Sequence, residues 1–203
     1  MTRIILVRHG QTEWNRIERF RGQMDVPLNE MGHRQAQAIA RALEKWPVAA
    51  VYASPLSRAQ DTARPIAAAF QLLIQTSPGL LDINYGRWAC LTPQEAGEQY
   101  PEMHTLWRTQ PHLACPSGGE SLADVRERAV AALRQVLAAH AEQTVVLVGH
   151  QVVNKVLCCA ILGLDLSHFW RVRQSNACIN MFEHHDGVFE IVLLNDTCHL
   201  AGL

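Results

Sequence analysis

The sequence predicts an α/β protein, a three-layer α/β/α sandwich whose central sheet is mostly parallel and ends in an antiparallel hairpin at one edge. Short apolar, β-branched runs alternate along the chain with segments of helical periodicity. Near the C-terminus, Asp186-Gly187 separates two further apolar runs, a pattern that favours a hairpin. The 203 residues, 48% hydrophobic and 18% charged, suit a single globular domain, residues 1–203.

The first half of the chain contains three predicted strands. Residues 3–7 form a short apolar run that suits a buried strand. Asn29 is a good N-cap for a helix that begins at the next residue. Residues 48–53 form a second strand, which Ser54-Pro55 ends because a residue before proline avoids the α region. A helix then runs from Arg58 to about Phe70, and residues 72–74 are a third strand candidate.

The second half begins irregularly and then becomes periodic again. Residues 92–110 mix helix formers with prolines and lack periodicity, so a small cap-like excursion from the sheet is expected at about 92–118. Ser121 and Asp124 form a capping box that begins a long helix. Residues 144–149 repeat the pattern of a buried strand, and a helix over 152–162 follows. The runs 177–183 and 188–194 form the hairpin.

Charge and composition exclude several classes of partner. The net charge of -1 and the pI of about 6.8 give no reason to expect a nucleic acid or a membrane as partner. No apolar run approaches the roughly 18 residues of a membrane span, and no charged-then-apolar leader precedes Arg3. A cytoplasmic location is therefore expected. The six cysteines show no CxxC spacing, so we expect reduced, core-like residues and no metal.

Charged and titratable residues follow three of the predicted strands. Arg8-His9 ends the first strand, Arg58 lies just after the strand 48–53, and His150 follows the strand 144–149. Because the carboxyl ends of parallel strands meet at one edge of a sheet, these side chains should converge there. Two guanidinium groups beside two imidazoles suit a phosphoryl group. The cations disfavour histidine protonation, so at least one histidine should be neutral, as a nucleophile requires; the pattern does not say which.

Asp82 is the candidate proton donor for a leaving alkoxide. Its apolar neighbours would desolvate the carboxyl group and raise its pKa, as a general acid requires; they are Leu80, Leu81, Ile83 and Trp88. The alternative is that Asp82 only caps a turn beside Gly86.

Four ordered motifs resemble the histidine phosphatase superfamily, in its phosphoglycerate mutase-like branch. They are Leu6-Val7-Arg8-His9-Gly10-Gln11-Thr12-Glu13-Trp14-Asn15, the stretch 52–63, Gly118-Gly119-Glu120-Ser121 and Val146-Leu147-Val148-Gly149-His150. The resemblance covers nearly the whole chain, and four motifs in order are far more specific than a lone Arg-His-Gly. It implies a phosphoglycerate mutase-like fold.

The resemblance also implies a reaction. His9 matches the family's phosphorylated histidine, and Asp82 falls where the family carries its general acid. The implied reaction is attack by the histidine on a phosphomonoester, followed by hydrolysis of phosphohistidine. It requires neither metal nor cofactor, and its substrate would be a small phosphorylated metabolite. The residues expected to hold the phosphate or the rest of the substrate are Arg8, Arg58, His150, Asn15, Arg21, Gly22 and Gln151.

Two departures from the family pattern bear on chemistry and substrate. Asp82 stands where relatives usually have glutamate, and Ala89-Cys90 replaces Glu-Gly. The side chain is one methylene shorter, and reaction geometry is sensitive to shifts of about 1 Å. Arg21 replaces the usual glutamine, which adds a positive charge and favours a more anionic substrate.

Other functions remain open from the sequence. A phosphoglycerate mutase-type phosphotransferase would carry additional segments that close the site, and the single modest excursion favours a phosphatase instead. A catalytically weak phosphate-binding regulatory module would keep the pocket without a competent acid. A metal site could also be built near the C-terminus, although the spacing fits no zinc pattern; its ligands would be His184, His185, Cys198 and His199.

The last expectations concern substrate contact and assembly. His199 could fold back with the tail over the rim, and Tyr85 lies close to the candidate acid, so both are predicted to contact the substrate. Trp107, Phe169 and Trp170 suit a dimer face as well as the core. A homodimer therefore stays open.

Overall fold

The computed structural model describes residues 1–203, and it contains one six-stranded sheet in the order β3-β2-β4-β1-β5-β6. The four strands on one side are parallel, whereas β5 is antiparallel to β1 and β6 is antiparallel to β5. The predicted mostly parallel sheet with an antiparallel edge hairpin is confirmed. The strands are β1 (Thr2–Arg8), β2 (Val48–Ala53), β3 (Ile74–Thr76), β4 (Thr144–Gly149), β5 (Ile179–His185) and β6 (Val188–Asp196).

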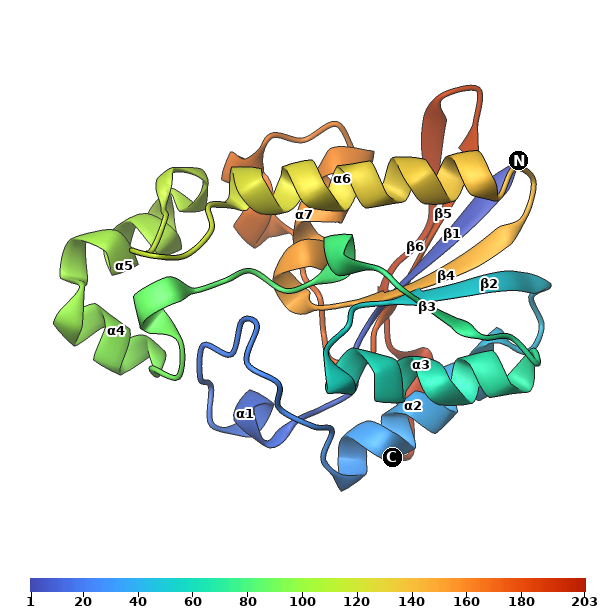
Figure 1. Ribbon diagram of the computed structural model, residues 1–203, viewed down its shortest axis with the longest axis horizontal. Coiled ribbons are helices and arrows are strands. Elements are labelled where there is room, and N and C mark those ends of the chain that lie inside the picture. The colour runs from blue at the N-terminus through green and yellow to red at the C-terminus, as the bar shows by residue number, and fades with distance from the viewer.

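Helices cover both faces of the sheet (Figure 1). One apolar core lies between the sheet and the pair α2 (Glu30–Leu43) and α3 (Ser57–Ala69). The other lies between the sheet and the pair α6 (Leu122–Ala139) and α7 (Gln151–Ile161). The shorter helices are α1 (Glu13–Arg16), α4 (Pro93–Gln99), α5 (Pro101–Thr109), and the 3-10 helices η1 (Pro78–Leu80), η2 (Gly86–Trp88), η3 (Pro111–Leu113), η4 (Leu166–Arg171) and η5 (Cys198–Leu200).

The local signals in the sequence act as predicted. The side chain of Asn29 accepts a hydrogen bond from the backbone N–H of Gly32 at 2.9 Å, which caps α2. Ser121 and Asp124 satisfy one another's backbone N–H groups at the start of α6. In the hairpin turn, Asp186 and Gly187 have φ angles of 49° and 80°, as a tight turn between antiparallel strands requires.

Two segments differ from the sequence-based prediction. The third strand lies at Ile74–Thr76, later than the expected 72–74. The segment over residues 92–110 contains two helices, α4 and α5, each with a proline in its first turn. Prolines there are compatible with helix because the first N–H groups need no helical partner. These two helices project beyond one end of the sheet in Figure 1.

The cysteines are all free, but not all of them are core residues. Cys158, Cys159 and Cys178 are buried, as expected. Cys115 and Cys198 are exposed, because one lies in the loop before α6 and the other in η5 near the C-terminus. The expectation of six core-like cysteines was therefore wrong for these two.

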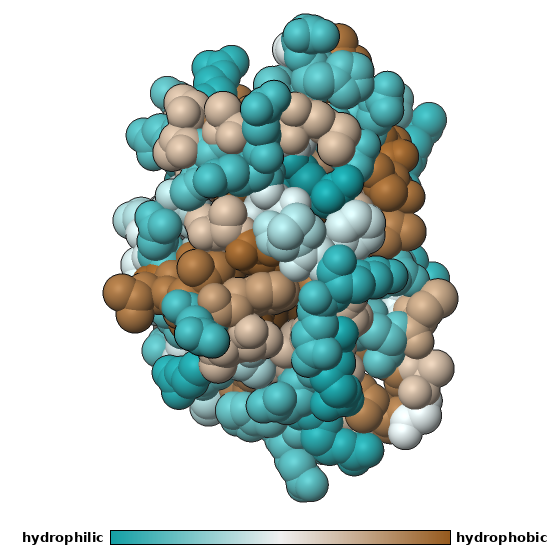
Figure 2. All heavy atoms as spheres, turned by 90° about the vertical axis from the view of Figure 1, so that its right-hand side faces the viewer, coloured by the Kyte–Doolittle hydropathy of each residue, from teal (hydrophilic) through white to brown (hydrophobic).

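No helix has the length and apolar character needed to cross a membrane. Figure 2 shows the end of the molecule opposite α4 and α5, where apolar patches interrupt a largely hydrophilic surface. The edge strand β6 pairs only with β5, and five of its apolar side chains are exposed: Val188, Ile191, Val192, Leu193 and Leu194.

Candidate active site

The carboxyl ends of β1, β2 and β4 bring four predicted site residues together. Arg8 ends β1 and His9 follows it, Arg58 lies in the first turn of α3, and His150 precedes α7. All four are buried, with at most 5% of their surface exposed. The imidazole rings of His9 and His150 have centroids 5.1 Å apart. The predicted convergence of these strand ends is present in the structure.

His9 has a defined tautomer. Its Nδ1 lies 2.6 Å from the carbonyl oxygen of Gly10, and a carbonyl only accepts, so Nδ1 carries the proton. The lone pair is therefore on Nε2, which is buried and has no hydrogen-bond partner in the protein. The turn is fixed by Gly10, whose N–H donates to Thr62 Oγ1 at 3.0 Å and whose absent Cβ would lie 2.5 Å from Gly32 O.

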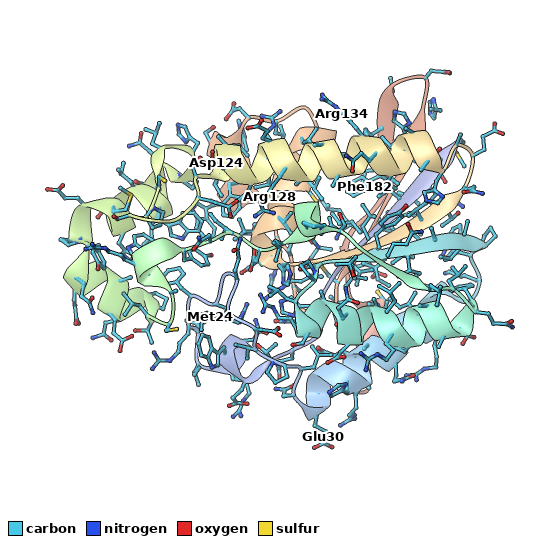
Figure 3. All side chains as sticks on the ribbon, in the orientation of Figure 1. Met24, Glu30, Asp124, Arg128, Arg134 and Phe182 are labelled. Atoms are coloured by element: carbon cyan, nitrogen blue, oxygen red, sulfur yellow. The ribbon has the colours of Figure 1, made fainter.

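His150 is held by Arg58 and Ser54. Arg58 Nε donates to His150 Nδ1 at 3.1 Å, so the proton of His150 is on Nε2, which lies 2.8 Å from Ser54 Oγ. The other two guanidinium nitrogens donate to the carbonyl oxygens of Gly22 and Met24, both at 2.7 Å. Arg58 thus ties the loop that carries Met24 (Figure 3) to the strand ends.

Burial and neighbouring cations keep both histidines neutral. Desolvation, with Arg58 as the next cause, lowers the pKa of His9 and that of His150 well below the ordinary value of 6.5. The sequence predicted at least one neutral histidine, and here both are neutral. Burial also lowers the pKa of Arg8 and of Arg58 to about 10, so both guanidinium groups remain charged at neutral pH.

Arg8 is oriented by a buried amide network. Its Nη1 donates to the carbonyl oxygen of Gln174 at 2.5 Å. The side chain of Gln174 donates to Asn180 Oδ1 at 2.7 Å, and Asn180 Nδ2 donates to the carbonyl oxygen of Leu6 at 2.9 Å. No motif in the sequence indicated this network, because Gln174 lies in an aperiodic segment and Asn180 stands among apolar residues in the first half of β5.

The backbone around Asp82 is held by Arg128, which reaches in from α6 (Figure 3). Its guanidinium donates to the carbonyl oxygens of Gly79, Leu81 and Asp82 at 3.1, 2.7 and 3.0 Å. It also forms an ion pair with Glu120 at 2.8 Å. Both side chains of this pair are 22% exposed, so solvent screens the ion pair. The hydrogen bonds to the three carbonyl groups therefore contribute more to holding the backbone than the ion pair does.

The Asp82 carboxyl group is buried and desolvated. The residue is 4% exposed, and Oδ1 is buried without a hydrogen-bond partner. Burial raises its pKa from 3.8, against the opposing fields of Arg58 and Arg21. The turn at Gly86 is capped by Asn84 Oδ1, which accepts the Gly86 N–H at 2.9 Å. The alternative that Asp82 caps this turn is therefore wrong.

Arg8 and Asp82 face a cavity of about 460 Å³. Arg21 also lines it; this side chain is 8% exposed and its Nε is buried without a partner. Gly22 has a φ of 50° and approaches Ile83 so closely that a Cβ would lie 2.5 Å from its carbonyl oxygen. The predicted residues that line the cavity are Arg8, Asn15, Arg21, Gly22, Asp82, Tyr85 and Gln151.

Sequence reasoning missed most of the cavity's outer wall. Four of its nine side chains are aromatic, and their positions in the sequence show no common spacing because they come from separate segments. Only the fold brings them together. The additional lining residues are Trp14, Glu18, Arg19, Phe20, Pro93, Trp107, Val152, Trp170 and Asn176.

His199 is not among the residues that line the cavity, and neither are His9, Arg58 and His150, so substrate contact by His199 stays a prediction. The tail turns toward α2 and places His199 Nε2 3.0 Å from the carbonyl oxygen of Ala177. The N–H of Ala177 in turn donates to His9 O at 3.1 Å. His199 therefore supports the backbone behind His9.

The alternative metal site near the C-terminus is not assembled. No group of three or more His, Cys, Asp or Glu side chains in the structure could hold a metal ion. His184 and His185 lie at the hairpin tip, whereas Cys198 and His199 follow the far end of β6. Nine residues of strand separate the two pairs, about 30 Å at 3.4 Å per residue.

The three aromatic residues that suited either a core or a dimer face differ in burial. Trp107 and Phe169 are buried, with 3% and 1% exposure. Trp170 is 45% exposed and belongs to the cavity wall.

Comparison with known proteins gives a consistent picture. A model of the histidine phosphatase superfamily, branch 1, matches residues 4–197. Phosphoserine phosphatase 1 of Hydrogenobacter thermophilus is 38% identical over 99% of this chain and 95% of its own. A metal-independent phosphoserine phosphatase of Arabidopsis thaliana is 35% identical over 100% of this chain and 85% of its own.

The structural comparison covers the chain equally well. Bacillus stearothermophilus YhfR superimposes with a TM-score of 0.94 and 31% identity, over 98% of this chain and 100% of its own. Three mycobacterial relatives are longer: this chain, 35% identical to them, spans 55% of their length.

Proposed function

Since the chain belongs to the histidine phosphatase superfamily, branch 1, we infer that it is a phosphatase of small phosphorylated metabolites. Relatives of similar length that are named phosphoserine phosphatases support this activity. The site geometry supports it independently. The observation that carries the proposal is His9 Nε2, an unprotonated, buried and unpartnered nitrogen set among arginine side chains.

In the first step His9 Nε2 attacks the phosphorus of a phosphomonoester. A P–N bond forms while the P–O bond to the alcohol breaks, and the leaving oxygen takes the proton of Asp82. Arg8 and Arg58 remain charged and stabilise the negative charge on the transferring phosphoryl group. His150 keeps the Arg58 guanidinium in orientation through its Nδ1.

In the second step water attacks the phosphohistidine. The P–N bond breaks, a new P–O bond forms, and the proton of the water returns to the Asp82 carboxylate. The cycle releases inorganic phosphate and restores both residues. The charge stabilisation in both steps comes from arginine side chains, so we propose a reaction that needs neither metal ion nor cofactor.

Arg21 adds a third cation beside the transferred phosphoryl group. Its Nε has no partner in the protein, unlike Arg58, whose nitrogens are all hydrogen-bonded to protein atoms. Arg21 is therefore free to bind a substrate oxygen. With Asn15, Gly22, Tyr85 and Gln151 it forms the proposed substrate side of the cavity.

The proposal is tested by phosphate release from phenyl phosphate in excess chelator. Wild type should turn over, and His9→Ala should lose at least a thousandfold in kcat, since the nucleophile is gone. His33→Ala, an exposed histidine on α2, is the matched control and should behave as wild type.

Denaturing wild type during turnover in alkaline detergent should trap phosphate on His9, seen by mass spectrometry without an acid step, because the P–N bond of phosphohistidine hydrolyses in acid. Phosphate binding without turnover would instead show the regulatory module. Phosphoryl transfer between two phosphoglycerates, faster than release to water, would show a mutase.

A further inference from the structure

A second hollow of about 370 Å³ lies beside the active-site cavity. The two share four lining side chains, so they are neighbours separated by one wall. The second hollow is formed largely by α4 and α5, the helices that project from the sheet in Figure 1. The shared residues are Phe20, Pro93, Trp107 and Trp170, and the second hollow adds Gln94, His104 and Arg108.

The shared wall carries a fixed aromatic shelf, made of Trp107 and Trp170. The two rings meet edge to face with centroids 5.6 Å apart, and Trp170 Nε1 donates to Trp107 O at 2.7 Å. Trp107 is buried, whereas Trp170 is 45% exposed. The indole of Trp170 therefore stands at the rim between the hollows, open to a ligand.

Lys155 holds this shelf from behind. Its Nζ lies 4.4 Å from the centroid of Trp170 and 4.7 Å from that of Phe169. The residue is 5% exposed and forms no ion pair, so the two aromatic faces are its partners. A desolvated cation over an indole is a strong contact of its type, so Lys155 stabilises the Trp170 ring in its position.

The far side of the second hollow is cationic. Arg108 is exposed and forms neither an ion pair nor a side-chain hydrogen bond. The side-chain amide of Gln94, by contrast, already has a partner within the protein, because it donates to Glu98 Oε1 at 2.9 Å. The guanidinium group of Arg108 is thus free to bind an anionic ligand in this hollow.

We propose that the second hollow is a subsite for the leaving group, built for phosphomonoesters whose alcohol carries a planar ring and, beyond the ring, an anionic substituent. The ring would pack on the exposed indole of Trp170, and the anion would meet Arg108. Aromatic surfaces suit ring stacking, and guanidinium groups suit carboxylate or phosphate. This inference rests on the proposed phosphatase activity, since it takes the phosphoryl group to be at His9.

Three substrates test it: phenyl phosphate, 2-naphthyl phosphate and 6-carboxy-2-naphthyl phosphate. For each, the ratio of variant to wild-type kcat/KM cancels the intrinsic reactivity of the ester. Trp170→Ala should lower the ratio for both naphthyl esters by about 5- to 10-fold more than for phenyl phosphate, the range of one aromatic contact. An equal loss on all three esters, or no loss, would overturn the shelf.

Arg108→Ala should lower the ratio for the carboxylated ester alone, by about threefold to fivefold, as for a solvent-exposed ion pair, and less at 0.5 M salt, where that pair is screened. Arg134→Ala is the matched control, because Arg134 is an exposed arginine on α6, away from α5 (Figure 3). An equal effect of both variants, or an effect of Arg108→Ala on the uncharged ester, would overturn the anion contact.

Calorimetry separates the two levels of the proposal. In a His9→Ala background, 2-naphthyl phosphate should bind more tightly than phenyl phosphate, and Trp170→Ala should remove that difference. If wild type hydrolyses none of the esters, the proposed function fails, and the calorimetric difference still decides whether the shelf exists. If that difference is absent or survives Trp170→Ala, the subsite is wrong whatever the enzyme hydrolyses.

Discussion

Replacing Asp82 by asparagine should abolish proton donation while leaving the fold intact. The two side chains have nearly the same shape, and the backbone here is held by Arg128 through three carbonyl groups. Asp82 is 4% exposed, so bulk water is poorly placed to supply the proton instead. We therefore expect the whole contribution of a general acid to be lost, about a hundredfold or more in kcat/KM for an alkyl phosphate.

The leaving group decides the size of that loss. A nitrophenolate leaves without protonation, so Asp82→Asn should cost less than about threefold on 4-nitrophenyl phosphate. Across a series of alkyl and aryl phosphates, the dependence of log kcat/KM on leaving-group pKa should be much steeper for the variant than for wild type. Equal losses on alkyl and aryl esters would refute the assignment of Asp82 as the acid.

The same variant has a stability signature with a definite sign. Burial raises the pKa of Asp82 above 3.8, so the folded state binds more protons than the unfolded state between those two pKa values. The free energy of unfolding then falls as pH rises through that window. Asp82→Asn removes this penalty, so it should be more stable than wild type at pH 7, by a margin that shrinks toward pH 4 in urea unfolding. A variant less stable than wild type at pH 7 would contradict a desolvated carboxyl group.

Three further predictions follow from the same contacts. Arg128→Met removes a donor from the carbonyls of Gly79, Leu81 and Asp82, of which Asp82 O alone keeps another partner, Gln23 Nε2 at 3.2 Å. It should cost about 2 kcal/mol in chemical unfolding, with kcat falling more than KM rises. Asn180→Leu breaks the buried network behind Arg8 and should cost about 2 to 4 kcal/mol, while weakening phosphate inhibition. The pKa values of His9 and His150 are depressed by burial; the unfolded state therefore binds more protons below pH 6.5, and the melting temperature should fall as pH drops from 7 to 5.

The strand ends could be predicted from sequence because each is a short apolar run followed at once by a polar break. Arg8, Arg58 and His150 each follow such a run, and parallel pairing alone brings them to one edge. The predicted burial of Asp82 depended on its apolar neighbours in sequence, and the residue is buried in the structure. The capping residues Asn29 and Ser121 act within one helical turn, so local chemistry sufficed for them.

The supports of the site depend on long-range contacts that leave no local trace. Arg128 lies 46 residues after Asp82 in the chain and reaches it only because α6 packs over η1. Gln174 and Arg8 are 166 residues apart. The position of His199 depends on long-range packing in the same way, since nothing in the tail indicates that η5 packs against α2.

The excess of buried positive charge links substrate binding to acid catalysis. The positive charges of Arg58, Arg21 and Arg8 all lower the pKa of Asp82 and so oppose the increase that burial causes. A phosphoryl dianion bound beside His9 would neutralise much of that field. With the cations offset and the cavity filled, desolvation should dominate more strongly, so we expect the pKa of Asp82 to rise further when substrate binds. The substrate would then promote the protonated form that its own leaving group requires.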